Sequence, residues 1–289
     1  MVWNWIVLAI STAVLGGSAE AQPVAGAPAA ASNARFADAD ALLLALERGD
    51  QGLQTFDADI EYDRRFELQG DQHIRRGHIY YKVIPTPAGA AGTRAVFAVR
   101  FNQLQIEDIV RTEEQTLVFD GQWLIEKNEA SKRFIKRQVA LPGEEINPLR
   151  LGEGPFPIPV GQKRADIVAR YEARLAPSDE SIEGEAHLSG DFIAGTTQIV
   201  LTPRPEFSRD EFREIRLWYR PEAGGRLLPR LARTVNRQGD VTIVRLVGMR
   251  VNADDFPASI VDIAEPPKGD GWEVQTELKR PEAPEPKPQ

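Results

Sequence analysis

The chain contains no cysteine among its 289 residues. It can therefore form neither disulfides nor thiolate metal sites, and it has neither a cysteine nucleophile nor the cysteine that anchors a bacterial lipoprotein. Histidine is scarce as well, with three residues. His73 and His78 are five positions apart, so on one continuous strand they point to opposite faces and cannot share a zinc ion. We therefore expect no metal site and no cofactor.

Positive charge does not predominate. The chain has 35 Lys and Arg against 43 Asp and Glu, which gives a formal net charge of -8. Surfaces that bind nucleic acid are usually strongly basic, so this balance argues against nucleic acid as a partner. The cations are scattered and often alternate with apolar residues, which indicates the solvated face of a sheet.

Motifs of catalysis are missing too. Ser189 lacks the glycine spacing of a nucleophile elbow, and no glycine-rich loop leads into a helix to hold phosphate. Carboxylate pairs such as Asp57 and Asp59 are frequent in an acidic chain, and we interpret them as part of a solvated face. We therefore expect no enzyme, with a hydrolase that uses His187 or Ser189 as the minority alternative.

One apolar run, residues 5–15, stands at the N-terminal end. It has about the length of a signal-peptide core and is too short to span a bilayer comfortably. Ala19-Glu20-Ala21 follows as a small-x-small cleavage site. We predict that residues 1–21 form a signal peptide cleaved near Ala21. The alternative is an uncleaved membrane anchor, because no Lys or Arg precedes the apolar run.

Composition also divides the rest of the chain. Residues 22–35 are rich in Ala and Pro and predict a linker. Residues 266–289 contain many prolines, which form neither ladders nor helices, and predict a disordered tail. Between them, residues 36–265 have the length of one large domain.

Amphipathic strands fill this domain. In residues 56–67 apolar and charged residues alternate, the pattern of a strand with one dry and one wet face. Asp120-Gly121 between apolar residues is a strong hairpin signal. Helical pattern is limited to a short stretch that ends at Gly49 and to residues 165–175, which follow a Pro-broken apolar segment. Further predicted strands are residues 74–84, 95–101, 134–139, 199–204, 215–220 and 241–246.

These patterns predict a mainly β (α+β) fold. We expect one strongly curved antiparallel sheet with one apolar face, forming a half-barrel. An N-terminal helix and a central helical lid across the open side complete the expected architecture.

Three stretches of the domain share their order and spacing with a known family. They are Gly77-His78-Ile79-Tyr80-Tyr81-Lys82, then Val118-Phe119-Asp120-Gly121-Gln122-Trp123-Leu124, then Leu201-Thr202-Pro203-Arg204 leading to Phe256 and Pro266-Pro267-Lys268-Gly269. Together they resemble the LolA/LolB-like superfamily of periplasmic lipoprotein carriers, of which the chain looks like a divergent member. The resemblance covers residues 42–269. It departs from the family where Lys82-Val83-Ile84-Pro85 lacks the usual Arg, and where residues 147–175 are longer.

The resemblance implies a periplasmic carrier that binds acyl chains of lipoproteins or other envelope lipids in a hydrophobic cavity and moves them towards the outer membrane. An inner-membrane donor and an outer-membrane acceptor are the implied partners, and the carrier itself is expected to be a monomer. The large apolar residues expected to line the cavity and its lid are Phe97, Phe101, Phe119, Trp123, Phe134, Phe156, Ile158 and Trp218.

Two questions stay open at this point. Periodicity does not distinguish the lining of a lipid cavity from filled core, so both interpretations of these large residues stand. The same fold also suits a module that senses lipids or lipoproteins, or a scaffold that binds a membrane-anchored envelope protein. In that alternative the Pro-rich tail would serve as a docking strand.

Overall fold

The computed structural model describes residues 35–85, 93–141, 144, 151, 160–183, 185, 187–207, 211–222 and 225–279. All of them belong to one compact unit, Ala31–Gln289. The helices are α1 (Ala39–Gly49) and α2 (Arg164–Arg170), with two 3-10 turns, η1 (Gly190–Phe192) and η2 (Pro205–Phe207). The strands are β1 (Thr55–Arg65), β2 (Gln72–Pro85), β3 (Thr93–Ile106), β4 (Ile109–Phe119), β5 (Trp123–Asn128), β6 (Arg133–Gln138), β7 (Tyr171–Ala176), β8 (Thr197–Pro203), β9 (Phe212–Pro221), β10 (Leu227–Asn236), β11 (Val241–Val251) and β12 (Glu273–Glu277).

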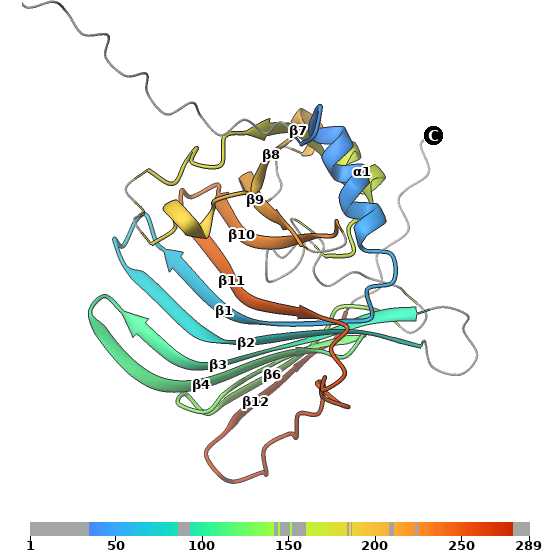
Figure 1. The fold of residues 1–289 in the computed structure, drawn as a ribbon. Helices are drawn as coiled ribbons and strands as arrows, with labels where there is room; N and C mark the ends of the chain where they lie inside the picture. Colours follow the sequence, from blue (N-terminus) through green and yellow to red (C-terminus); the bar gives the residue numbers. More distant parts are fainter. Residues whose placement is uncertain are drawn as a thin grey trace, which may run out of the picture. The chain divides into compact units, whose positions relative to one another are not determined.

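In the described residues these strands form one sheet of twelve, in the order β12-β6-β5-β4-β3-β2-β1-β11-β10-β9-β8-β7. The sheet curves strongly and is not closed into a barrel, because β7 and β12 remain its two edges (Figure 1). Neighbouring strands pair antiparallel except for β12, which pairs parallel with β6. The predicted curved half-barrel fold is confirmed.

Residues at its two ends determine where α1 begins and ends. The Asp38 side chain accepts a hydrogen bond of 2.8 Å from the Ala41 backbone N–H, which caps the N-terminus of α1. Leu42 and Leu43 are buried against the sheet. The helix ends at Gly49, as its sequence predicts.

Local chemistry also forms the hairpin between β4 and β5. The Asp120 carboxylate accepts backbone hydrogen bonds from Gln122, at 2.9 Å, and from Trp123, at 2.8 Å. Gly121 has φ +101°, a conformation that glycine adopts without steric cost. The Asp-Gly signal therefore predicted this turn correctly.

Side-chain alternation gives the sheet two faces. We call the face on which α1 packs the inner face and the opposite one the outer face. Phe56, Ala58 and Ile60 of β1 point to the inner face and join its core cluster. Asp57 and Asp59 point to the outer face, as the alternation in the sequence predicts.

The outer face is also apolar at both ends, in contrast to the single apolar face expected from the sequence. At one end, residues 252–272 cover an outer cluster on β3 to β6, which contains Val96, Val118 and Phe134. At the other end, residues 177–196 cover an outer cluster on β9 to β11, which contains Trp218 and Leu231. The two covering segments carry isolated apolar residues without strand periodicity, so their role was not visible in the sequence.

Two predicted elements differ from the structure. The helix expected over residues 165–175 ends at Arg170, and Tyr171–Ala176 form β7 against β8. Tyr171 and Ala176 are buried in this strand, and pairing with the buried strand β8 outweighs helix propensity. The tail expected to be disordered from residue 266 contains β12. The predicted signal peptide and residues 22–34 lie outside the described residues, as do residues 147–150 and 152–159 of the predicted lid.

In the part of the chain that the structure describes, no helix has the length and apolar character needed to cross a membrane.

Candidate functional site

A row of aromatic side chains lies on the inner face. Phe97 of β3 and Phe119 of β4 are paired in register, with their rings stacked at 6.0 Å. Phe56 and Tyr81, on β1 and β2, stack at 5.1 Å. Phe101 completes the row and is also buried. All five rings belong to the largest core cluster of the described residues.

Side chains of α1, α2 and the segment before α2, which we call the cover, join the same core cluster as this aromatic row, and α1 itself contacts α2, β7 and β10. Leu42 and Leu43 of α1, Ile167 of α2, and Leu151 and Val160 from the segment before α2 are all buried in the inner cluster. In this conformation the rings face packed side chains, with Phe97 0% and Phe119 1% exposed. The inner face is therefore filled core in the structure, under a cover that belongs to separate elements.

Polar contacts hold the cover in place. The Arg164 guanidinium of α2 donates to the Asp40 carboxylate of α1 at 2.6 Å. The Tyr171 hydroxyl donates to the Leu151 carbonyl at 3.4 Å. The first of these contacts joins α2 to α1, and the second joins the segment before α2 to β7.

An apolar seam runs between the cover and the strands. Leu46, Leu53, Phe56, Val160 and Met249 are among the residues that line it, and its cavity volume is about 10 Å³. A space of this size holds no acyl chain. Any apolar ligand that entered this seam would therefore have to displace side chains that line it.

One carboxylate lies in this seam. Asp50 accepts a hydrogen bond of 2.8 Å from the Gly161 backbone N–H. Burial raises the pKa of Asp50 to about 6, although the Gly161 hydrogen bond and the charge of Arg226 act in the opposite direction. Burial and the nearby Asp50 charge raise the pKa of Tyr81 to about 12, and the same causes raise the pKa of Tyr219.

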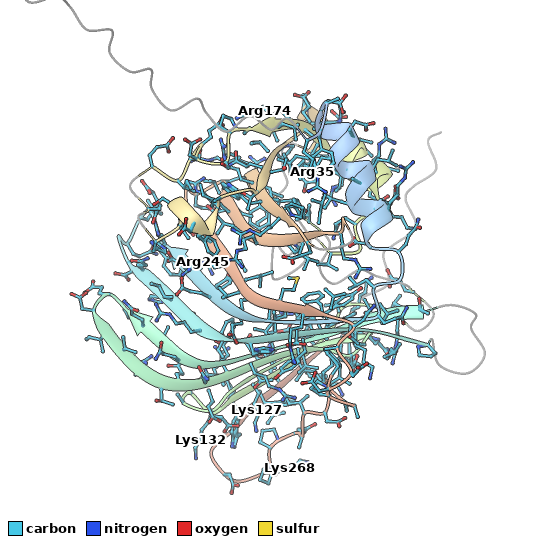
Figure 2. The ribbon with its side chains drawn as sticks, viewed as in Figure 1. Arg35, Lys127, Lys132, Arg174, Arg245 and Lys268 are labelled. Atoms are coloured by element: carbon cyan, nitrogen blue, oxygen red, sulfur yellow. The ribbon has the colours of Figure 1, made fainter. Side chains whose placement is uncertain are left out.

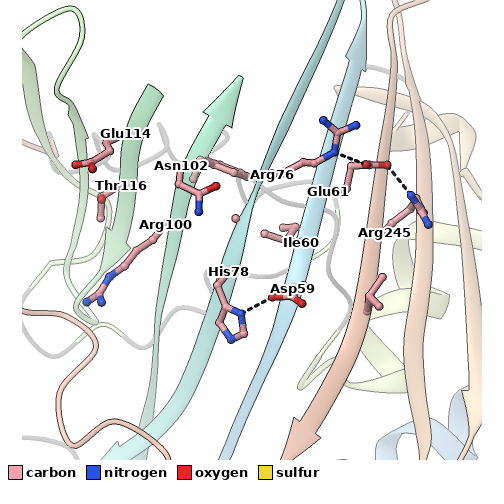
Figure 3. Close-up of a pocket in the computed structure, with 13 residues that line it drawn as sticks. Asp59, Ile60, Glu61, Arg76, His78, Arg100, Asn102, Glu114, Thr116 and Arg245 are labelled. Carbon is pink, nitrogen blue, oxygen red and sulfur yellow. Dashed lines mark hydrogen bonds and ion pairs between the residues drawn. The ribbon is translucent and has the colours of Figure 1, made fainter. Parts of the chain in front are cut away.

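The middle of the outer face holds a polar groove of about 600 Å³ (Figure 3). Glu61 accepts from Arg76 and from Arg245, each at 2.8 Å. His78 contacts Asp59 through Nδ1 at 2.9 Å and Asp57 through Nε2 at 3.1 Å. The charges that line the groove largely neutralise each other.

Asp57 differs from its prediction as part of a solvated face, because it is 1% exposed. His78 and Arg250 contact its Oδ1, which compensates part of the cost of burial, whereas its Oδ2 is buried without a hydrogen-bond partner. Within the described residues, no group of three or more His, Asp or Glu is arranged to hold a metal ion.

The structure separates the residues predicted to line one cavity. Phe97, Phe101 and Phe119 lie together on the inner face. Trp123 and Phe134 belong to the outer cluster under residues 252–272, and Trp218 belongs to the other outer cluster. These three point away from the inner aromatic row and do not share a cavity with it. Phe156 and Ile158 lie outside the described residues.

Several residues of the inner site were missed. Alternation in residues 56–67 predicts Phe56 on the dry face of its strand, but its contact with Tyr81 follows from strand pairing that the sequence does not reveal. Asp50 follows the end of a helix and has the sequence context of a surface residue. Val160 stands in a Pro-broken segment without periodicity. No local signal identifies Asp50 or Val160 as part of the seam.

No protein-family model and no curated protein sequence matches this chain. Similar solved structures include a conserved protein from Thermus thermophilus, with 11% identity over 82% of this chain and 97% of that one, and a TM-score of 0.37. A LolA superfamily protein from Nitrosomonas europaea has 12% identity, coverage of 73% and 93%, and a TM-score of 0.29. LprF from Mycobacterium bovis has 10% identity, coverage of 73% and 92%, and a TM-score of 0.34. At such low scores these matches carry no argument about the family of this chain or about what it binds.

Proposed function

We propose that this protein is a periplasmic carrier that binds acyl chains of lipoproteins or other envelope lipids and moves them towards the outer membrane. The acyl chains would lie against the inner aromatic row formed by Phe56, Tyr81, Phe97, Phe101 and Phe119. The observation that supports this proposal is that the aromatic row shares one core cluster with two short helices and a connecting segment. Such elements separate from a sheet more readily than a second sheet would.

Removal of acyl methylenes from water drives the proposed binding. Each buried methylene contributes about 0.8 kcal/mol, so one long acyl chain contributes on the order of 10 kcal/mol before ordering costs. Because the seam volume is about 10 Å³, the acyl chain must replace apolar packing that the cover provides. The net affinity is the free energy of packing the acyl chain against the rings minus that of packing the cover there.

The proposed cycle needs no enzymatic step and no cofactor. An inner-membrane donor would load the carrier, and an outer-membrane acceptor would receive the lipid as the cover returns to the aromatic row. Closure of the cover favours release because it restores the apolar packing of Leu42, Leu43 and Ile167. We propose that the carrier acts as a monomer, with energy for loading supplied by the membrane donor.

Mass spectrometry of the organic extract tests the proposal. The protein would be purified from a periplasmic fraction, and a stoichiometric phospholipid or lipopeptide is expected in the extract. Titration of the delipidated protein with a fluorescent fatty acid then gives an affinity. A protein that carries no lipid and does not respond to the fatty acid would contradict the carrier function.

Matched variants locate the binding surface. Phe97→Leu with Phe101→Leu keeps the inner face apolar but removes ring surface, and we expect about tenfold weaker binding of the fatty acid. Trp218→Phe alters an equally buried aromatic residue on the outer face and is expected to leave the affinity unchanged. Equal losses in the two variants would place binding elsewhere than the inner face.

A further inference from the structure

The strand β12 is an exception within the sheet. It is the one described strand that pairs parallel to its neighbour, and its register sets Glu273 opposite Arg133 and Glu277 opposite Arg137. It also forms one edge of the sheet, so it contacts a strand on one side alone. In Figure 1 it lies at the opposite end of the sheet from β7.

Weak contacts hold β12 on this edge. Four of its five residues are exposed, and Val274 retains 43% of its surface. Arg137 and Glu277 approach to 2.6 Å and Arg133 and Glu273 to 3.5 Å, but each partner is more than a third exposed. Exposed ion pairs of this kind contribute about 0–1 kcal/mol each. Lys279, just after the strand, donates to the Glu144 carboxylate at 2.7 Å, and both side chains are about a third exposed. The strand therefore depends mainly on its backbone hydrogen bonds to β6 and on this one exposed contact.

The residues just before β12 are held differently. Trp272, Phe256 and Ile260 pack into the outer cluster on β3 to β6. This apolar packing anchors the chain up to Trp272. β12 can therefore leave the edge without disturbing the segment that precedes it.

Release of β12 would expose the backbone N–H and C=O groups of β6. Such an edge is a template for an extended peptide, which adds as a further strand. The edge is also basic, since Arg133, Lys136 and Arg137 are three of the six residues in β6. Figure 2 shows Lys127 and Lys132 at the same end of the molecule. The backbone groups and the positive charges of the β6 edge together suit one kind of ligand, an extended strand with acidic residues four positions apart.

We propose that the β6 edge is a docking site for an extended acidic segment of a partner protein. The segment adds parallel to β6 and places two carboxylates, four residues apart, on Arg133 and Arg137. The chain's own β12 occupies the edge in cis and competes with the partner. This interaction is separate from acyl binding, because the inner aromatic row and the outer side of β6 do not share residues.

A labelled peptide with the sequence of residues 272–279 serves as the probe. The full chain carrying Glu273→Lys and Glu277→Lys should release β12 and bind this peptide at least tenfold more tightly than the unmodified chain does. Asp262→Lys with Glu265→Lys is the matched control, because it makes the same charge change at exposed residues outside β12. That control should bind the peptide no better than the unmodified chain.

Charge reversal tests the register. A second peptide carries Lys in place of Glu273 and Glu277, and the β12-released variant should not bind it. Arg133→Glu with Arg137→Glu in the otherwise unmodified chain places like charges opposite Glu273 and Glu277, which should also release β12, and this second variant should prefer the Lys peptide to the acidic one. Binding of neither peptide, or equal binding of both, would overturn the proposal.

Hydrogen exchange on the unmodified chain provides a measurement that needs no variant. The amides of β12 should exchange much faster than those of β1, and an excess of the acidic peptide should accelerate them further. Exchange in β12 as slow as in β1 would show that the strand is not displaceable. Dimerisation of the β12-released variant in the absence of peptide would assign the edge to self-association and would also overturn the proposal.

Discussion

The Asp50 carboxylate accepts a 2.8 Å hydrogen bond from the backbone N–H of Gly161, 111 residues further along the chain. Asp50 directly follows α1, and Gly161 stands just before α2. This contact therefore joins the end of the first helix to the segment that covers the inner face. It places an ionisable group in the seam that any acyl ligand would have to open.

Asp50→Asn should stabilise the protein at neutral pH. Burial raises the folded-state pKa of Asp50 from 3.8 to about 6, so the folded state binds this proton more tightly than the unfolded state does. The contribution of Asp50 to the free energy of unfolding is therefore largest below pH 4 and declines as the pH rises to 6. Asparagine retains the acceptor for Gly161 without the charge, and we expect a gain of about 1–3 kcal/mol at pH 7.

Urea unfolding at pH 4, 5, 6 and 7 measures this effect. The variant should show a flatter dependence on pH than the unmodified protein. Asp40→Asn, which alters the exposed pair with Arg164, is the matched control and should not flatten the profile. Parallel profiles for the Asp50 variant and the unmodified protein would rule out the predicted effect of burial.

Gly77→Ala should strongly destabilise the sheet. A Cβ at Gly77 would lie 2.0 Å from the Arg100 carbonyl oxygen and 2.7 Å from the Phe101 Cα. Both atoms belong to the backbone of β3, so the strands must move apart at the cost of about 3 kcal/mol or more. Thermal unfolding checks this, with Gly49→Ala as the control because its nearest contact is an ordinary 3.7 Å. A melting temperature as high as that of the control would contradict the close approach.

Trp218→Phe should loosen the outer cover formed by residues 177–196. The Trp218 indole is fully buried and donates to the Ser178 carbonyl at 2.7 Å. Phenylalanine keeps most of the apolar contact but leaves that carbonyl without its donor, which costs about 1–2 kcal/mol. Limited proteolysis should cut residues 177–196 faster in the variant. Unchanged cleavage would show that the hydrogen bond does not secure this segment.

Glu180→Gln should reduce the loss of stability in acid. Hydrogen bonds from Arg174 and Arg216 lower the pKa of Glu180 to about 2. An acid with a depressed folded-state pKa contributes stability above its unfolded pKa of about 4.5, and this contribution disappears as the pH falls towards 2. Unfolding between pH 5 and 2 should therefore show a smaller decline in the variant. A decline as large as that of the unmodified protein would exclude this role for the ion pair.

Some elements follow from local chemistry alone, and the sequence predicted these correctly. Asp38 caps a helix, Asp120-Gly121 makes a hairpin turn, and alternation in residues 56–65 makes a two-faced strand. Each depends on residues that are neighbours along the chain. The mainly β class and the curved, open sheet follow from the number and spacing of such elements.

The composition of the candidate site depended on contacts that are distant in sequence. Alternation assigns Phe97 and Trp218 each to a face of its strand, but it does not say which face is inner when both faces are apolar. The segments 177–196 and 252–272 decided this, because they bury Trp218 and Phe134 on the outer face. Pairing with β8 makes residues Tyr171–Ala176 a strand. Pairing with the edge of β6 does the same for Glu273–Glu277. The sequence determined which segments are amphipathic, and only the tertiary structure determined what covers each face, because burial is a property of the partner as well as of the residue.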